Sequence, residues 1–184
     1  MHQQMIDAVK YWVEHTVIGF NFCPFAKREF DKGSIRYEVI DSKNVSEQLL
    51  GLLNELKRLD QDETIETTLL IFPVGLEGIL DYLDYLEEAN NLLMDRGYEG
   101  IYQLASFHPD YCFQGNKDND PSNYTNRSPY PMLHIIRERS LERALAKFAH
   151  PELIPERNIQ LARDKGVQVF EDILTQAKRL KSKF

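Results

Sequence analysis

The chain has 184 residues, of which 42% are hydrophobic and 28% are charged, and its formal net charge is −7. A chain of this length is expected to form one domain whose core needs neither disulfides nor a structural metal. The negative charge argues against binding along a nucleic-acid backbone, which requires clustered Lys and Arg. No apolar run approaches the roughly 20 residues that span a bilayer, so we expect no membrane segment.

Two cysteines, Cys23 and Cys112, are too few for a disulfide framework or a zinc ribbon. The N-terminal segment 1–15 is amphipathic and lacks the apolar core of a signal peptide. These features predict a cytoplasmic protein in a reducing environment. One basic run, residues 178–183, is interpreted as a solvated tail that places cations at a helix C-terminus.

The first predicted element is an amphipathic helix, because apolar residues recur at helical spacing from Met5 to Val17. Gly19 is expected to end this helix. The following segment, residues 20–26 (FNFCPFA), is too apolar for a surface loop. Pro24 suits the first position of a new helical turn, which would place Cys23 near the N-terminus of that turn.

Three strand patterns follow, separated by two leucine-rich helix patterns. Residues 35–39 alternate apolar and charged side chains, which indicates a strand near the edge of a sheet. Residues 67–72 (TTLLIF) predict a central strand covered on both faces. Residues 101–107 predict the third strand.

This β-α-β-α-β order, with helices long enough for crossovers, favours parallel pairing and right-handed connections. Two more helices are predicted after the third strand, one over residues 132–148 and one from Pro155 to Ala177. The sequence therefore predicts a single α/β domain over residues 1–184, with a small, mainly parallel sheet and additional N- and C-terminal helices.

A long loop, residues 106–131, connects the third strand to the next predicted helix. It combines Cys, Asp, Asn, Tyr, Arg and His residues with several prolines. Long irregular loops in compact domains are usually functional or disordered, and the prolines and aromatic residues favour order. Ligand sites in open sheets form beyond the carboxyl ends of parallel strands. We therefore expect this loop to be ordered and to carry the functional site.

The candidates for acid–base and nucleophilic chemistry are His108, Asp110 and Cys23. His108 leaves the third strand beside Asp110, which would orient the imidazole as general acid or base. The alternative is a structural histidine that fixes the loop. Cys23 is the predicted nucleophile, because a helix N-terminus lowers the pKa of a thiol. The alternative for Cys23 is an inert wall of the pocket.

A candidate anion site begins at Asn126, Arg127 and Ser128, just before the helix predicted from residue 132. Backbone N–H groups at the start of that helix, together with the Arg127 guanidinium, would bind phosphate or carboxylate. Arg137 lies on the same predicted helix and could either join Arg127 at the loop or extend its charged end to solvent. The alternative is that Ser128 caps the helix while Arg127 pairs with an Asp of the loop.

Tyr111 and Tyr130 are the predicted sources of a hydroxyl group for the same ligand. A metal site is an alternative, because His108, His134 and Asp110 would give the two imidazoles and one carboxylate that suit Zn or Fe. Their positions match no recognisable ligand spacing. The GxGxxG and P-loop patterns of nucleotide-binding proteins are absent from the sequence.

Three segments, NFCPFA (21–26), SFHPDY (106–111) and NYTNRSPYPMLH (123–134), resemble the signatures of a bacterial family known as domain of unknown function 1415. The resemblance runs nearly end to end and implies a compact bacterial cytoplasmic domain. It assigns no catalytic residue, so the site prediction rests on the residues themselves. Position 112 is not usually cysteine in that family, which argues against a redox role for Cys112.

These residues predict a hydrolase or transferase that acts on a small anionic metabolite in a cleft lined by His, Arg and Cys. The first alternative is a metal-dependent enzyme with His108, Asp110 and His134 as ligands. The second is a non-enzymatic binding or adaptor domain, in which Tyr124 and Tyr130 anchor a partner protein.

Overall fold

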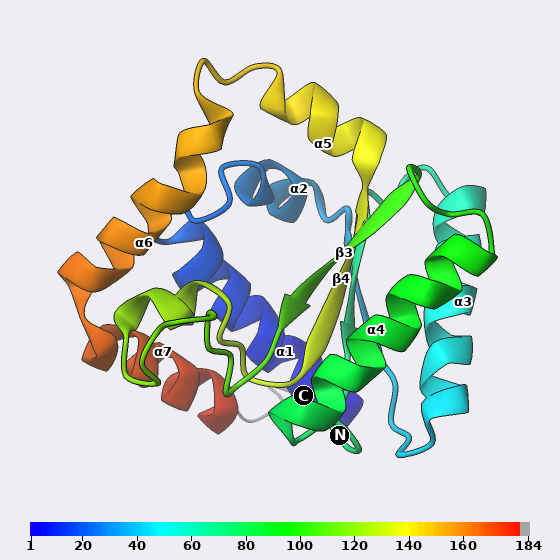
Figure 1. Cartoon of the computed structure of the whole chain (residues 1–184), viewed down its shortest axis with the longest axis horizontal. Coiled ribbons are helices and arrows are strands. Elements are labelled where there is room, and N and C mark those ends of the chain that lie inside the picture. Colours follow the sequence, from blue (N-terminus) through cyan, green and yellow to red (C-terminus); the bar gives the residue numbers. More distant parts are fainter. Residues whose placement is uncertain (181–184) are drawn as a thin grey trace.

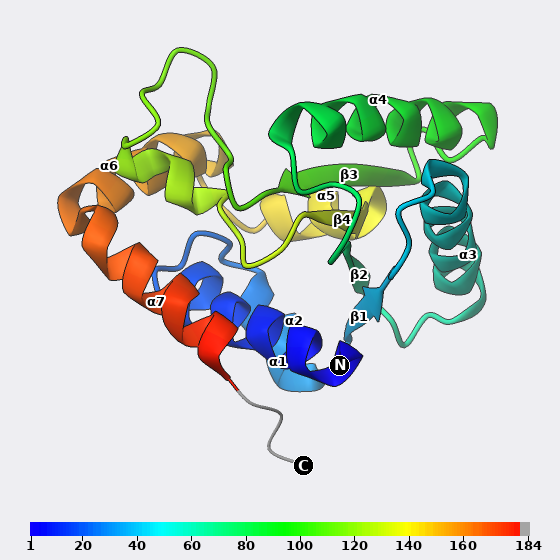
Figure 2. The ribbon, with the colours of Figure 1, turned by 90° about the horizontal axis from the view of Figure 1, so that it is seen from below.

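A four-stranded sheet lies between two helical layers in the computed structural model, which describes residues 1–180 (Figures 1 and 2). In chain order the elements are α1 (His2–Trp12), the π-helix η1 (Val13–Ile18), α2 (Ala26–Lys32), β1 (Ile35–Val39), α3 (Val45–Gln61), β2 (Thr67–Ile71), α4 (Ile79–Asp95), β3 (Tyr102–Phe107), the 3₁₀-helix η2 (Pro121–Thr125), β4 (Met132–Arg137), α5 (Glu138–Leu145), the 3₁₀-helix η3 (Pro151–Leu153), α6 (Ile154–Lys165) and α7 (Val167–Arg179).

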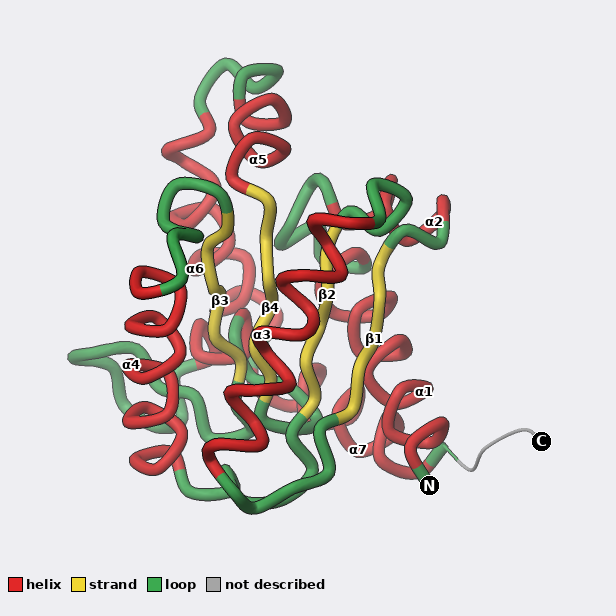
Figure 3. The backbone as a smooth tube through the Cα atoms, turned by 90° about the vertical axis from the view of Figure 1, so that its right-hand side faces the viewer, coloured by secondary structure: helices red, strands yellow, loops and turns green. Residues whose placement is uncertain are grey.

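The strands lie in the order β1-β2-β4-β3 (Figure 3). β1 and β2 are parallel, whereas β4 is antiparallel to both of its neighbours, β2 and β3. The α/β class is therefore confirmed, but the prediction of a mainly parallel sheet is not. The three predicted strands do run in one direction, and β4 separates the second from the third.

The helix predicted over residues 132–148 is wrong in its first part, which forms β4. A short apolar run such as MLHIIR does not by itself distinguish a strand from a buried helix. In the structure Leu133 and Ile135 belong to the core on one side of the sheet, and Met132 belongs to the core on the other side. This alternation has the period of two that defines a strand.

The helix predicted from Pro155 to Ala177 is two helices, α6 and α7, which meet at Gly166. Gly166 has a φ of 76°, a conformation that glycine adopts readily and other residues rarely do. Of the predicted basic tail, Lys178 and Arg179 end α7. Lys181 and Lys183 lie outside the described residues.

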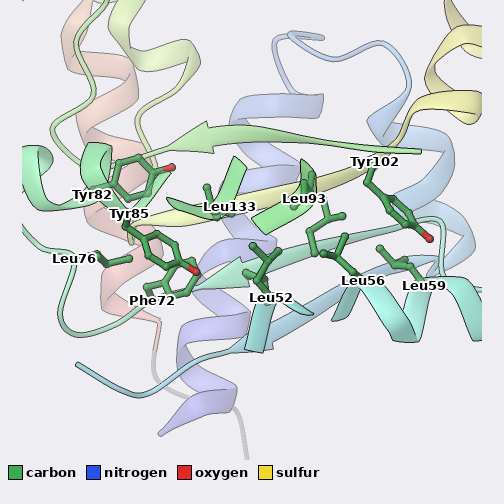
Figure 4. Packing of buried hydrophobic residues seen from close by; sticks show 13 residues of the cluster. Leu52, Leu56, Leu59, Phe72, Leu76, Tyr82, Tyr85, Leu93, Tyr102 and Leu133 are labelled. Atoms are coloured by element: carbon green, nitrogen blue, oxygen red, sulfur yellow. The ribbon is translucent and has the colours of Figure 1, made fainter. Parts of the chain in front are cut away.

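The main core lies between the sheet and the helices α3 and α4. Leu133 of β4 and Phe72, just after β2, point into it from the sheet, and Leu52, Leu56 and Tyr85 point into it from the two helices (Figure 4). These side chains are almost completely buried. Their removal from water is the main source of stability for this layer.

A second core lies on the opposite face of the sheet, where Leu69 and Ile71 pack against Val9, Trp12 and Val13 of α1 and η1. The helix α7 lies against α1 on this side (Figure 2). Because both faces are covered, β2 is buried along its whole length, as predicted.

The predicted edge position of the first strand is also confirmed, since β1 pairs with β2 alone among the described strands. The carboxyl ends of the predicted strands meet at one edge of the sheet, where Val39, Ile71 and Phe107 lie in a row with Met132 at the start of β4. The loops that leave this edge include residues 108–131. No helix within residues 1–180 has the length and apolar character needed to cross a membrane.

Candidate functional site

The loop between β3 and β4 is held by a buried amide. Asn123 of η2 is fully buried, and its Nδ2 donates to the Lys117 carbonyl (2.9 Å) while its Oδ1 accepts from the Phe113 N–H (3.1 Å). Asp120 caps η2 and pairs with Arg163 of α6, and that guanidinium holds the pKa of Asp120 well below its usual range. These contacts give the loop a defined conformation against α6 (Figure 1).

The Arg127 side chain is bound to the same loop. Its Nε donates to the Tyr111 carbonyl (2.9 Å) and its Nη2 to the Asp118 carbonyl (2.8 Å), and the guanidinium lies 4.8 Å from the centre of the Tyr124 ring. The helix expected after Ser128 is the strand β4, so the helix N-terminus of the predicted anion site is missing. Arg127 therefore stabilises the loop through backbone carbonyls.

His108 is completely buried at the carboxyl end of β3. Its Nδ1 accepts from the Asp110 N–H (3.0 Å), so Nε2 carries the proton and donates to the Leu76 carbonyl (3.0 Å). Burial lowers the pKa of His108, which keeps the ring neutral. Both ring nitrogens are thus used inside the fold, which matches the structural alternative. The group of Asp110 that orients the ring is its N–H.

The residues of the predicted metal site lie on opposite faces of the sheet. The His108 ring is 5.1 Å from the Tyr82 ring of α4, whereas the His134 ring lies 6.4 Å from Phe107, which packs on Trp12 of α1. Within residues 1–180, no group of three or more His, Cys, Asp or Glu side chains is placed to hold a metal ion. The alternative of a Zn or Fe site at His108, Asp110 and His134 has no geometry to support it.

His134 lies in the middle of β4. The Thr67 hydroxyl donates to the Ile135 carbonyl, so it accepts the proton of His134 Nε2 across 2.7 Å. Burial lowers the pKa of His134 to about 4. The ring is therefore neutral at pH 7 and serves as a hydrogen-bond donor between two strands.

We expect the free energy of unfolding to fall as the pH drops below about 6.5. His108 and His134 are neutral in the folded chain but have an ordinary pKa near 6.5 when unfolded, so the unfolded chain binds more protons in acid. Each histidine lowers the free energy of unfolding by at most about 1.4 kcal/mol per pH unit, until the pH reaches its pKa in the folded chain. Urea unfolding between pH 7.5 and 4.5 measures the slope. His134→Gln should reduce it, and the exposed His150→Gln should not; a stability that stays constant over this range would contradict the prediction.

A pocket of about 340 Å³ opens at the carboxyl end of β3. Its walls come from η1 and the turn that follows, from the end of β3, from the loop 108–131 and from α6. The lining residues are Val17, Phe22, Cys23, Phe107, Phe113, Thr125, Asn126, Ile154, Pro155, Asn158 and Ile159. The lining is mostly apolar and includes no Lys, Arg, His, Asp or Glu among the described residues.

The wall at Cys23 has an unusual backbone. η1 is a six-residue π-helix, a rare element that occurs often at functional sites, and Asn21 has a φ of 54°. The helix α6 holds this turn from outside, because Asn158 Nδ2 donates to the Phe22 carbonyl (2.7 Å) and the Arg157 guanidinium donates to the Asn21 carbonyl. The irregular turn is thereby fixed with Cys23 in the pocket wall.

Burial raises the pKa of the Cys23 thiol, although the N–H groups of Phe25 and Ala26 favour the thiolate. The sequence predicted a lowered pKa for this thiol, because it placed Cys23 near the N-terminus of a helix. The helix α2 begins three residues after Cys23, at Ala26, and the loss of hydration outweighs the nearby N–H groups. At neutral pH this side chain is a protonated thiol.

The other predicted ligand-binding residues are dispersed. Asn126 lines the pocket and donates to the Ser106 carbonyl (3.1 Å). Ser128 donates to the Tyr130 carbonyl (2.6 Å) and caps no helix. The Tyr130 ring packs into the core beside α1, and burial raises its pKa, while the Tyr111 ring packs edge-on against a neighbouring aromatic ring of the loop.

Arg137 lies at the other end of β4, about 17 Å along the strand from Met132. Its guanidinium donates to the Leu59 and Ile65 carbonyls and to the Tyr102 hydroxyl. It cannot join Arg127 at the loop. The error follows from the helix that was predicted in place of β4, since a strand rises more than twice as far per residue as a helix.

The residues of α6 that line the pocket were not among the predicted site residues. These residues are Ile154, Pro155, Asn158 and Ile159. Their apolar spacing predicts a helix, but no local pattern shows which part of the chain this helix covers. The contact with Asp120 through Arg163 depends on tertiary packing, so it had no signal in the sequence.

The comparisons with known proteins agree with the resemblance in the sequence. A family model described as a protein of unknown function (DUF1415) matches residues 4–172, and the chain belongs to this family. No curated protein and no solved structure matches the chain. The function must therefore be inferred from the geometry of this chain.

Proposed function

We propose that the chain binds a small, uncharged and mainly apolar molecule in the pocket beside Cys23. The observation that carries the proposal is that this pocket joins two segments, residues 20–26 and 106–131, that lie far apart in the chain. Small-molecule sites are typically concave, mostly apolar and supplied with a few polar groups. The volume of about 340 Å³ is at the lower end of the range for such sites.

The lining favours a neutral ligand over the anion expected from the sequence. An anion held in an apolar pocket needs a cation or several N–H donors. The two arginines next to lining residues in the sequence, Arg127 and Arg157, are bound to backbone carbonyls of the chain itself. The polar groups in the lining are a thiol, a hydroxyl and two amides. Asn126 donates one N–H to the Ser106 carbonyl and Asn158 donates one to the Phe22 carbonyl, so the second N–H of each amide would be the donor for a ligand.

A hydrolase or transferase reaction in this pocket would need Cys23 as its nucleophile. The raised pKa of the thiol works against this role, and no imidazole or carboxylate belongs to the described lining to remove the proton. Binding is therefore the function that the geometry supports best. A binding or adaptor role without catalysis was one of the alternatives open from the sequence, and in this proposal the ligand is a small molecule.

Filling the pocket should abolish binding. Ile159→Trp places a larger side chain in the lining, and Leu153→Trp makes the same kind of change at an exposed position of the neighbouring η3. We expect a thermal-shift screen of neutral aromatic and aliphatic amides and alcohols to yield stabilising compounds. The shift should disappear in Ile159→Trp and persist in Leu153→Trp. Stabilisation by phosphates and carboxylates alone would contradict the proposal.

Thiol labelling gives an independent readout of the same pocket. Iodoacetamide should react slowly with Cys23 at pH 7, and a stabilising compound should slow this reaction further while it leaves Cys112 unchanged. Labelling of Cys23 that is much faster than that of Cys112 would revive the nucleophile hypothesis. A rate at Cys23 unaffected by a stabilising compound would place the ligand elsewhere.

A further inference from the structure

The strand β1 forms an open margin of the sheet (Figure 3). All five of its residues, 35–39, are partly exposed. A groove of about 320 Å³ runs beside this strand, between residues 33–37 and the side chains Gln3, Ile6 and Lys10 of α1. Open strand edges present unpaired backbone groups and are the natural place for a further strand to bind.

Alternate residues of β1 direct their backbone groups to the open side. At its two ends, the Ser34 carbonyl accepts from the Glu66 N–H and the Ile40 N–H donates to the Ile71 carbonyl of β2. The backbone N–H and C=O groups of the even-numbered residues of β1 therefore face β2. The N–H and C=O groups of Ile35, Tyr37 and Val39 point the other way, and no hydrogen bond among the described residues occupies them.

From this geometry we infer that a second copy of the chain binds along β1, antiparallel and centred on Tyr37, so that two four-stranded sheets join into one. In this register Tyr37 exchanges hydrogen bonds with the Tyr37 of the second copy, and Ile35 exchanges them with Val39. Every outward N–H of one copy then finds a carbonyl of the other. The contact is isologous, as in most homodimers.

The charges of β1 select this register. With Tyr37 at the centre, Arg36 of each copy lies opposite Glu38 of the other, and such opposite-charge pairs across strands are favourable. A slip by two residues in one direction places Arg36 opposite Arg36. A slip in the other direction places Glu38 opposite Glu38. The strand IRYEV is therefore complementary to itself in one antiparallel register and repulsive in the neighbouring ones.

The two charged side chains remain partly exposed in the single chain, with 28% of Arg36 and 36% of Glu38 accessible to solvent. Arg36 already pairs with Glu38 of its own strand and with Glu55 of α3 (2.7 Å), and these two contacts fix the direction of its guanidinium at the edge. In the dimer these side chains would join into one alternating network of two Arg and two Glu residues, and their order exists before a partner binds. This reduces the entropy lost on association.

Sedimentation velocity from micromolar to several hundred micromolar protein tests the inference. We expect a concentration-dependent dimer. Glu38→Arg should raise its dissociation constant about tenfold or more, because each of the two Arg36–Glu38 pairs across the interface becomes a pair of Arg side chains. Glu87→Arg makes the same charge change at an exposed position of α4, which packs on β3 at the opposite edge of the sheet, and should leave the dimer intact. Melting curves of both variants show that they fold.

Hydrogen exchange on the unmodified chain is the second measurement. The amides of Ile35, Tyr37 and Val39 should exchange quickly in dilute protein and become protected as the concentration rises. A chain that remains monomeric over the whole range would overturn the inference. So would a dimer in which these three amides still exchange quickly, or one that Glu38→Arg leaves unchanged, because association would then use another surface.

Discussion

Replacing Arg137 by methionine is expected to lower the free energy of unfolding by about 3 kcal/mol. The Arg137 guanidinium binds the Leu59 carbonyl in the last turn of α3, the Ile65 carbonyl (3.0 Å) before β2 and the Tyr102 hydroxyl (3.1 Å) at the start of β3. A cation at a helix C-terminus is favourable, and the carbonyls left without a donor would lose hydrogen bonds to a charged group. Methionine keeps most of the length and none of the donors.

Urea unfolding at pH 7.5 and thermal melting measure this effect, with a melting temperature lower by roughly 6–12 °C as the thermal counterpart. Arg139→Met is the matched control, because Arg139 is exposed at the start of α5 and makes no hydrogen bond or ion pair among the described residues. The control should change stability by less than about 0.5 kcal/mol. Equal losses in the two variants would show that Arg137 does not join these three elements.

Elements whose apolar residues recur with a clear period were predictable from the sequence, whereas β4, whose apolar run fits either a strand or a helix, was not. The alternation in residues 35–39 and the continuous apolar run at 67–72 gave the correct strands and their positions at an edge and in the centre of the sheet. The run MLHIIR is too short to show which period it follows. Its pairing with both β2 and β3 is a long-range contact, and the mixed sheet follows from that pairing.

The segments that meet at the pocket were predictable from the sequence, but the contacts of their side chains were not. The row formed by Val39, Ile71 and Phe107 shows why residues after each strand meet at one edge. Residue type, however, does not reveal what a side chain binds. In the sequence His108 resembles a catalytic group and Arg127 an anion-binding group. In the structure their polar atoms bind backbone groups of the chain itself.

His108→Ala is therefore expected to act on stability, with a loss of about 3–4 kcal/mol in the free energy of unfolding. The substitution leaves a cavity beside Tyr82 and removes the partners of the buried Leu76 carbonyl and the Asp110 N–H. The backbone N–H of His108 also donates to the carbonyl of Asn126 (3.2 Å), a residue of the pocket lining. A more mobile turn at residue 108 should therefore make the pocket more accessible. Urea unfolding measures the loss, and faster iodoacetamide labelling of Cys23 reports the change in the pocket.

Two further variants separate a structural histidine from a catalytic one. In His108→Asn the side-chain carbonyl can still accept from the Asp110 N–H, so about half of the lost stability should return. The exposed His150→Ala should change the free energy of unfolding by less than about 0.5 kcal/mol. A His108→Ala chain as stable as His150→Ala would mean that the ring is dispensable to the fold. A structural role would then not account for His108, and the hypothesis that it acts as a general acid or base would be favoured again.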